Sequence, residues 1–335
     1  MAYVKGFLQL IAYGDAYGAP YEESDHGLEE RLREEAKSGQ RRAFVTRDSD
    51  LPLKWTDDTA MNLAVGRAML GPRGYTTDGV LLEYAAALKD PLVSGWGRIV
   101  PAALAAGKGI QNTRRNGALM RTPMVMASYV YSEGYSDRIL KGYSPGVHVA
   151  NDAALTHDSE VCVAASVAYG VVLDAFLGGR CDDFLSMVFL TEDVGPRLRQ
   201  ELMLRVADRS AMVEVFDAFR DACRWLHSSP SAVLTEVRAN PEIATGDVVA
   251  TLATSLWLGM RAASSCWMGL ELNKTLDLGI AIGGDVDTRL ALAAPFALPF
   301  FDEGDVMPNF SKIERYEEIL ALEEQISKRK TTRAA

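Results

Sequence analysis

Two long apolar segments restrict the fold more than any other feature of this sequence. Residues 161–177, VCVAASVAYGVVLDAFL, are apolar nearly all round, and residues 248–272 repeat this character with interruptions at Gly259 and Gly269. A helix that is apolar on every side is normally buried inside a larger helical bundle. Segments in which polar and apolar residues alternate are scarce, so the sequence predicts a compact all-α fold.

Composition and chain organisation favour one domain. The chain has 335 residues, of which 48% are hydrophobic, and no Pro/Gly/Ser-rich linker divides it. Such a chain can bury a sizeable core and is not disordered. We expect a single domain over residues 1–325 and a flexible basic tail over residues 326–335.

Charge and cysteine usage limit the partners and the compartment. A net charge of −10 disfavours general nucleic-acid binding, which needs a basic face. The apolar run at residues 290–301 is interrupted by prolines and is too short to cross a bilayer. We therefore expect neither a nucleic-acid nor a membrane partner. The four cysteines are dispersed and form no C-x-x-C pair, so we expect a cytoplasmic protein. We also expect it to be monomeric. The cysteines are Cys162, Cys181, Cys223 and Cys266.

The stretch WTDDTAM, residues 55–61, precedes an apolar run with helical spacing. Thr56 or Asp57 can cap this helix by accepting backbone N–H hydrogen bonds. Two adjacent carboxylates flanked by threonines also offer the oxygen ligands that a hard cation such as Mg²⁺ prefers. Both interpretations remain open for this stretch on its own.

A second stretch, GGDVDT at residues 283–288, has the same character and also precedes an apolar helical run. A capped helix start explains it equally well when it is taken alone. If the two stretches met in space, their aspartates and threonines would form an oxygen-rich site. One or two Mg²⁺ or Mn²⁺ ions would then relieve the repulsion between the carboxylates.

Three other stretches combine turn or helix-start character with polar side chains: GDAYGAPYE, NGALMRTP and LTHDSE. In the first, Asp15 can accept N–H groups in a turn, and Glu22 is either solvated or aimed inward by the turn at Pro20. In the second, Arg121 pairs with a phosphate or with a helix carboxylate. In the third, His157 contacts a ligand or is structural.

In this order, the five stretches resemble the ADP-ribosylglycohydrolase family, which includes the dinitrogenase-reductase-activating glycohydrolases. The resemblance spans nearly the whole chain, from Gly14 to about Pro308. It implies a compact, orthogonal multi-helix fold with a central metal cleft that holds two Mg²⁺ or Mn²⁺ ions. Two departures are Val286, where a small polar residue is common and which we expect to point away from the metals, and Pro295, which affects the length of the last helical run.

The resemblance also implies roles for individual residues. Glu22 matches an acidic residue near the metals that some members use in catalysis or gating, and Glu22 and Asp58 are the candidate catalytic residues that would accept the proton of the water. Residues 116–120 match a loop near the diphosphate or distal ribose. The implied metal ligands are Thr56, Asp57, Asp58, Asp285, Asp287 and Thr288. The implied substrate-binding residues are Asn116, Gly117, Ala118, Met120, Arg121 and His157.

The activity implied by the resemblance is hydrolysis of the bond between C1 of the distal ribose and a modified acceptor, with arginine-linked ADP-ribose on protein as the first expectation. O-linked ADP-ribose on serine, other ADP-ribosyl conjugates and a non-catalytic ADP-ribose-binding role are the alternatives. Residues 23–54 match no family pattern closely and lie between Glu22 and Thr56, so they are candidates for substrate specificity.

Overall fold

The computed structural model describes residues 5–22, 53–131, 144–177, 194–302 and 304–334. Within these ranges the chain is helical, and its only β-type pairings are isolated bridges between Leu53 and Ile313 and between Arg115 and Asp247. The predicted all-α class is therefore confirmed.

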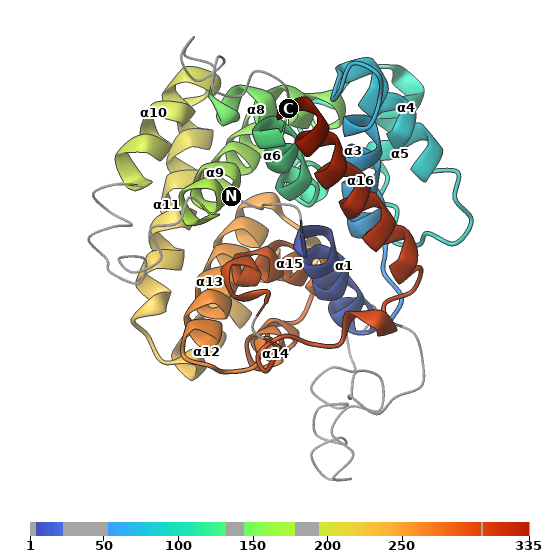
Figure 1. Ribbon diagram of the computed structural model, residues 1–335. Coiled ribbons are helices and arrows are strands. Elements are labelled where there is room, and N and C mark those ends of the chain that lie inside the picture. The colour runs from blue at the N-terminus through green and yellow to red at the C-terminus, as the bar shows by residue number, and fades with distance from the viewer. Residues whose placement is uncertain (1–4, 23–52, 132–143, 178–193, 303, 335) are drawn as a thin grey trace.

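Figure 1 shows the arrangement of these elements. The α-helices are α1 (Phe7–Gly18), α3 (Asp57–Met69), α4 (Thr77–Ala87), α5 (Ile99–Ala106), α6 (Thr122–Tyr131), α8 (Pro145–Thr156), α9 (Glu160–Leu177), α10 (Gly195–Arg205), α11 (Arg209–Leu226), α12 (Pro230–Arg238), α13 (Val248–Trp267), α14 (Leu272–Ile282), α15 (Val286–Ala293) and α16 (Tyr316–Ala334). The 3₁₀ helices are η1 (Ala19–Tyr21), η2 (Asn116–Ala118), η5 (Pro241–Thr245), η6 (Ala294–Phe300) and η7 (Phe310–Lys312).

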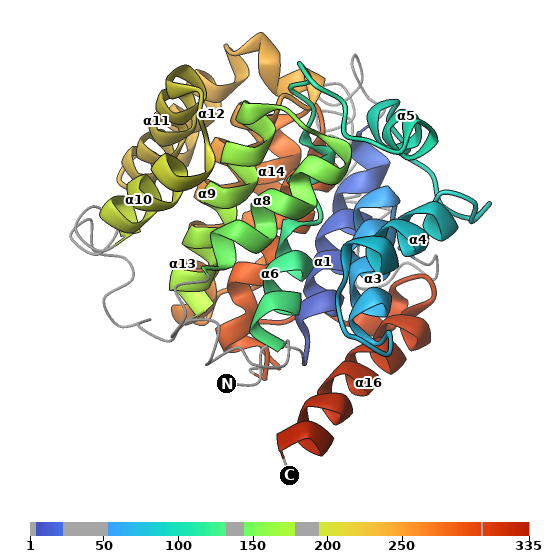
Figure 2. The same cartoon turned by 90° about the horizontal axis from the view of Figure 1, so that it is seen from above.

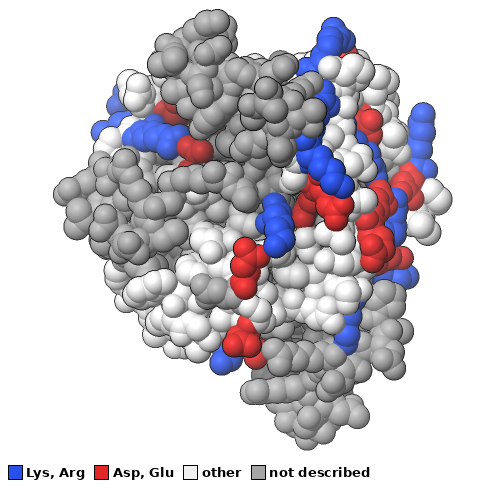
Figure 3. Space-filling model, in the orientation of Figure 1, with Lys and Arg blue, Asp and Glu red and all other residues white. Residues whose placement is uncertain are grey.

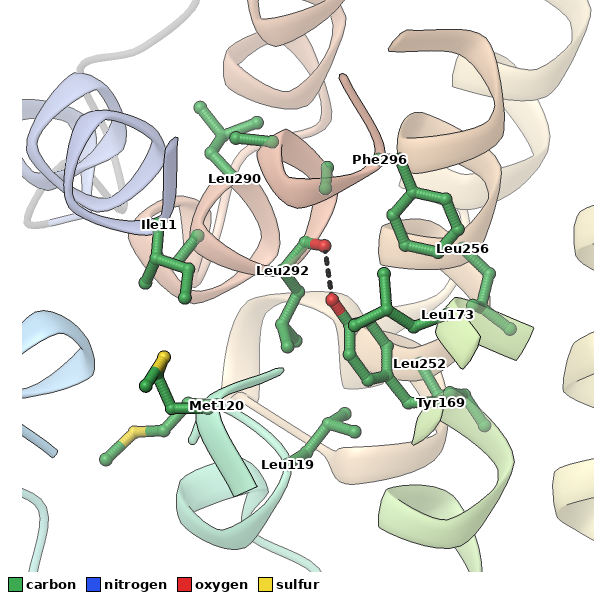
Figure 4. Packing of buried hydrophobic residues seen from close by; sticks show 14 of the residues in the cluster. Ile11, Leu119, Met120, Tyr169, Leu173, Leu252, Leu256, Leu290, Leu292 and Phe296 are labelled. Carbon is green, nitrogen blue, oxygen red and sulfur yellow. Dashed lines mark hydrogen bonds between the residues drawn. The ribbon is translucent and has the colours of Figure 1, made fainter. Parts of the chain in front are cut away.

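The two apolar segments that predict a helical bundle are α9 and α13, and both lie in its core. By length and composition α9 is apolar enough to cross a membrane, but 78% of it is buried against the rest of the protein. Figure 4 shows side chains of both helices meeting those of α15 and η6, and there the hydroxyl of Tyr169 donates to the backbone oxygen of Leu292. This bond satisfies a polar group inside an otherwise apolar core.

Helix α1 lies against α15 at very short range, because glycines face the contact. A Cβ atom added to Gly14 would lie 2.1 Å from the backbone oxygen of Leu290, and one added to Gly18 would lie 2.6 Å from Cα of Asp287. Only residues without a side chain permit this approach. Figures 1 and 2 both place α1 beside α3 as well. Helix α1 therefore lies between α3, which begins in the TDDT stretch, and α15, which begins in the GGDVDT stretch.

Helix α16 crosses α1 and α3 and closes the start of α1. The buried carboxylate of Glu323 accepts the backbone N–H groups of Gly6, Leu8 and Gln9, and also the side-chain amide of Gln9. These N–H groups belong to the first turn of α1, which has no other helical partner for them. A side chain from the far end of the sequence thus caps α1.

The expectation of a flexible tail from residue 326 does not hold for its first residues. Ile326 is only 3% exposed, and Arg329 donates to the backbone oxygen of Met69. The basic composition of this segment hides these two contacts with α3. The extent of the domain as a single unit stays a prediction.

The departures from the family pattern near the chain's second acidic stretch have a simple structural outcome. Val286 is fully buried, and its expected orientation away from the metals stays a prediction. Helix α15 ends at Ala293, and the chain continues as the 3₁₀ helix η6, which begins at Ala294 and contains Pro295. Proline lacks the N–H group that would continue an α-helix, so it shortens α15.

Charged side chains are intermixed by sign on the face of the molecule drawn in Figure 3. Glu318 of α16 pairs with both Arg67 and Arg315, and Glu324 pairs with Lys328. Acidic side chains of α16 thus neutralise nearby basic side chains.

Candidate metal centre

Asp15 of α1 holds the start of α3. Its carboxylate is fully buried and accepts the backbone N–H groups of Thr56 and Thr59, each at 2.9 Å. It also accepts their hydroxyls, at 3.0 Å from Thr56 and 2.6 Å from Thr59. The sequence suggests Asp15 as an acceptor in a local turn, but the groups it accepts lie on a helix more than forty residues away. Spacing along the chain gives no signal for such a contact.

The cap interpretation of the TDDT stretch is confirmed for Thr56. This residue is the N-cap of α3, in an extended conformation, and its hydroxyl oxygen accepts the N–H of Asp58. Asp57 and Asp58 occupy the first helical turn and are both buried. Capping and the acidic cluster therefore coexist, because Thr56 forms the cap while the two aspartates lie in the first turn.

In the second stretch, GGDVDT, the prediction that a side chain caps the helix is wrong for Asp285. Asp285 is the N-cap residue of α15 but makes no capping hydrogen bond. Its carboxylate instead accepts the side-chain amide of Asn116. Gly283 and Gly284 precede it with φ of 82° and 71°, a region that favours glycine. The glycine pair lets the chain turn sharply, so that Asp285 faces Asn116.

The two acidic stretches and Glu22 meet in space. Ligand oxygens of Glu22, Asp285 and Asp287 all lie within 4.8 Å of one another, a separation that one cation can bridge. Asp58 joins this group through two threonines: its Oδ2 accepts the hydroxyl of Thr288 at 3.0 Å and lies 3.4 Å from that of Thr56. We call these carboxylates and threonines, together with Asp57, the acidic cluster.

The position of Glu22 allows a second role besides the predicted one in proton transfer. We expect it to take part in proton transfer beside the metals, yet its carboxylate is as close to Asp285 and Asp287 as a shared cation requires. It follows η1, whose turn at Pro20 aims it at the cluster. The structure therefore makes Glu22 a candidate metal ligand as well as a candidate base.

Burial makes ionisation of the cluster unfavourable. Desolvation raises the pKa values of Asp57, Asp58 and Asp287 well above their usual range, and the neighbouring carboxylates raise them further. The starts of α3 and α15 meet here, and the positive ends of helix dipoles favour negative charge by roughly 0.3–1 kcal/mol each. That contribution is too small to offset several buried carboxylates, so the arrangement calls for a cation.

The residues present fit a hard cation. Oδ1 of Asp58 is buried and has no hydrogen-bond partner among the described residues, although a buried carboxylate oxygen normally has one. The whole donor set consists of carboxylate and hydroxyl oxygens, which suit Mg²⁺ or Mn²⁺ and not a soft metal. A buried carboxylate oxygen without a hydrogen-bond partner is available to a metal ion.

One residue near the cluster is absent from the sequence-based assignment. Gly95 has φ of 91°, and a Cβ added there would lie 2.5 Å from Oδ1 of Asp57. The backbone oxygen of the preceding residue, Ser94, accepts the N–H of Asp57. The two closely spaced glycines of SGWG are the only sequence signal for this approach, and they do not reveal which residue they approach.

The predicted substrate loop, residues 116–120, lies beside the cluster, and only some of its residues are exposed to solvent. Asn116 and Gly117 are partly exposed, whereas Ala118 and Met120 are buried in the core. Asn116 donates to Asp285 and also lies 3.2 Å from the hydroxyl of Thr251. Its amide therefore orients a candidate metal ligand, a role that the NG turn does not indicate.

Arg121 is not available to a phosphate. Its side chain is 0% exposed, and it forms an ion pair of 2.7 Å with Asp152 of α8. It also donates to the backbone oxygens of Asp152 and Gly117. The alternative of a helix carboxylate is thus the one that the structure adopts, because the ion pair neutralises a charge that would otherwise be buried alone.

His157 is similarly buried, at 1% exposed. Its Nδ1 lies 2.8 Å from the hydroxyl of Thr156, and burial, with the charge of Arg121 adding to it, lowers the pKa of His157 to about 3. A Cβ added to Gly117 would lie 2.8 Å from this ring. The neutral imidazole therefore packs behind the Asn116 loop and supports it from the core.

Some expectations fall outside the described residues. Almost all of the segment 23–54, the candidate for substrate specificity, lies there, and so does Cys181. Cys162 and Cys223 are buried free thiols, and Cys266 is also buried. Burial raises the pKa values of Cys162 and Cys223 to about 12, so both are unreactive thiols at neutral pH.

These features define an all-α protein with a buried acidic cluster suited to divalent cations. The chain belongs to the ADP-ribosylglycohydrolase family, whose sequence profile matches residues 2–297. No curated protein matches the sequence. Among solved structures, an "ADP-ribosylglycohydrolase-related protein complex" has a similar fold, with a TM-score of 0.58 and 19% identity over 97% of this chain and 96% of that one. At that identity the likeness concerns the fold alone.

Proposed function

We propose that this protein is a metal-dependent hydrolase that removes ADP-ribose from a modified acceptor, with arginine-linked ADP-ribose on protein as the preferred substrate. Family membership supports ADP-ribosylglycohydrolase-type activity. The observation that carries the proposal is the acidic cluster, in which Glu22, Asp285 and Asp287 converge beside the unpaired oxygen of Asp58.

Two Mg²⁺ or Mn²⁺ ions are the proposed cofactors, held by Thr56, Asp57, Asp58, Asp285, Asp287 and Thr288 with Glu22 adjacent. When bound, such ions orient ribose hydroxyls and lower the pKa of a coordinated water. Asn116 keeps the carboxylate of Asp285 turned toward the cluster, and the Gly95 backbone covers Asp57. These contacts restrict how the ligands can move.

In the proposed reaction, a water attacks C1 of the distal ribose as the bond to the acceptor breaks. Positive charge then develops on the ribose ring, and the surrounding carboxylates stabilise it. Glu22 or Asp58 accepts the proton of the water. The guanidinium of an arginine-linked substrate leaves as a neutral guanidine, which is a strong base and takes up the proton that Glu22 or Asp58 removed from the water, so an arginine linkage needs no second acid.

The diphosphate contact is not assigned to Arg121, because the ion pair with Asp152 occupies its side chain. Serine-linked or other ADP-ribosyl conjugates are the second candidate substrates, and a non-catalytic ADP-ribose-binding role is the third. The partners we propose are an ADP-ribosylated protein or ADP-ribose itself. A monomeric state and a cytoplasmic location also remain proposals, and the buried free thiols of Cys162 and Cys223 support the latter.

The test is release of free ADP-ribose from arginine-linked and serine-linked ADP-ribosyl peptides in Mg²⁺ or Mn²⁺. We expect release from the arginine-linked peptide, loss of release in EDTA, and loss of at least a hundredfold in Asp287→Ala with helical content retained. Asp302→Ala is the matched control, because its exposed ion pair with Lys5 contributes little. Wild-type rates in EDTA or in Asp287→Ala would refute the metal mechanism.

A further inference from the structure

We infer, on the basis of the proposed function, that Asp15 is a positioning residue: it accepts a hydrogen bond from the hydroxyl of Thr56 and thereby turns the remaining lone pair of Thr56 toward the cation. Asp15 is not itself part of the acidic cluster as defined above. It lies on α1, behind the start of α3, and its hydrogen bonds reach the cluster through Thr56.

The carboxylate of Asp15 is saturated by donors. Two backbone N–H groups and two hydroxyls, from Thr56 and Thr59, reach its oxygens at 2.6–3.0 Å when the shorter of each pair of contacts is taken. An ionised carboxylate has about four lone-pair sites for such bonds. Asp15 therefore has no oxygen left for a metal, and its role is to accept from these two threonines.

The hydroxyl of Thr56 has one hydrogen to donate, and three carboxylates surround this hydroxyl. Its Oγ1 lies 3.0 Å from Asp15, 3.2 Å from Asp287 and 3.4 Å from Asp58. Only one of these oxygens can receive the proton. Asp15 is the nearest and also holds the N–H of the same residue, so it fixes both the position of Thr56 and the direction of its O–H bond.

The contacts of Thr56 Oγ1 with Asp287 and Asp58 then have no hydrogen between the two oxygens. At 3.2 and 3.4 Å these oxygens repel one another unless a cation lies between them. With its O–H bond directed at Asp15 and one lone pair accepting the N–H of Asp58, Thr56 presents its remaining lone pair to a metal. Outer partners that orient a ligand in this way typically change metal affinity 10- to 100-fold when they are removed.

A purely structural role for Asp15 is the competing explanation, because the same carboxylate anchors α3. Thr59 separates the two. It is fully buried and donates to Asp15 at the shorter distance of 2.6 Å, but no hydrogen bond joins it to the acidic cluster in the described part of the chain. Removing its hydroxyl therefore weakens the anchor and leaves Thr56 in place.

The experiment measures the dissociation constant of Mn²⁺ for the full chain by calorimetry or electron paramagnetic resonance. In Asp15→Asn an NH₂ donor replaces one of the two acceptor oxygens, so four donors from Thr56 and Thr59 compete for one oxygen and the O–H bond of Thr56 is no longer held in place. We therefore expect Mn²⁺ to bind about 10- to 100-fold more weakly. Thr59→Val is the matched control, with lower thermal stability and an unchanged dissociation constant. Asp15→Ser is the second variant, and circular dichroism reports folding of each.

Wild-type affinity in a folded Asp15 variant would overturn the inference. So would an equal loss in Thr59→Val, or a failure of both Asp15 variants to fold, since each result would assign Asp15 to the fold alone. A wild-type chain that binds no Mn²⁺ would overturn the inference together with the metal centre. A chain that binds Mn²⁺ in the expected way but releases no ADP-ribose would refute only the proposed function.

Discussion

At Asp58, burial opposes ionisation, and the charges of Asp15 and Asp57 oppose it further. A folded-state pKa above the unfolded value means that the folded protein binds more protons. The contribution of Asp58 to the unfolding free energy of the metal-free protein therefore falls as pH rises from about 4 toward neutrality. Residues kept for binding often carry such a cost in stability.

We predict that Asp58→Asn raises the unfolding free energy of the metal-free protein by about 1–2 kcal/mol at pH 7, because it removes one buried charge from the cluster. The gain should shrink as the pH falls and vanish below the unfolded pKa of 3.8, where the wild-type carboxylate is protonated in both states. Urea unfolding in EDTA measures it, with Asp302→Asn as the exposed control. Destabilisation by Asp58→Asn at pH 7 would contradict this prediction.

His157 should give the opposite pH dependence. Its pKa is lowered to about 3 in the folded protein, against about 6.5 when unfolded, so the unfolded chain binds the proton first. Stability from the neutral imidazole is complete above pH 6.5 and is lost as pH falls. Between pH 6.5 and 4.5 the loss is about 2–3 kcal/mol, at about 1.4 kcal/mol for each pKa unit.

The measurement is the difference in unfolding free energy between wild type and His157→Gln across this range. The cluster carboxylates act alike in both proteins, so their contribution cancels in the difference. We expect the wild type to lose stability faster than His157→Gln as the pH decreases. Parallel curves would show that His157 is protonated in the fold, and would contradict the buried neutral imidazole.

The roles of single residues were predictable where chemistry alone decides them. Carboxylates next to threonines at a helix start predict oxygen ligands, and Thr56 and Asp58 lie accordingly. The roles of Arg121 and Asn116 were not, because each depends on a partner from a distant helix, Asp152 for the first and Asp285 for the second. No local pattern of residues encodes which distant carboxylate a side chain will meet.

Among the elements, α1 joins the two halves of the site. Its glycines face α15, and Asp15, between them in sequence, faces α3. The GDAYG stretch is thus a set of contacts on two sides of one helix. The sequence indicates helices here and the apolar segments predict their burial, but the close approach through Gly14 and Gly18 appears only when the packing is known.

We predict that Gly14→Ala and Gly18→Ala each lower the unfolding free energy by about 1–3 kcal/mol, the usual cost of overpacking. Gly18→Ala should also weaken Mn²⁺ binding more than Gly14→Ala does, because its methyl group would meet the backbone of Asp287. Thermal unfolding and Mn²⁺ titration measure the two effects. Gly304→Ala, where an added methyl group meets nothing within 4 Å, is the control.

For the whole molecule, cation binding and folding should be linked, since the acidic cluster exists only when segments from both ends of the chain have come together. We predict that free Mn²⁺ at about 100 times its dissociation constant raises the unfolding free energy by about 2.7 kcal/mol. The comparison is chemical unfolding with and without Mn²⁺, reversed by EDTA. Asp287→Ala should show no such increase, and an equal increase there would place the ion elsewhere.

The cap that Glu323 provides for α1 has a consequence for synthesis of the chain on the ribosome. Gly6 and Glu323 are 317 residues apart, so α1 emerges long before its cap exists. At translation rates of about 5–20 residues per second, the delay is roughly fifteen seconds to a minute. Throughout that time the nascent helix exposes apolar surface and open N–H groups, which is the state that a chaperone at the exit tunnel would recognise.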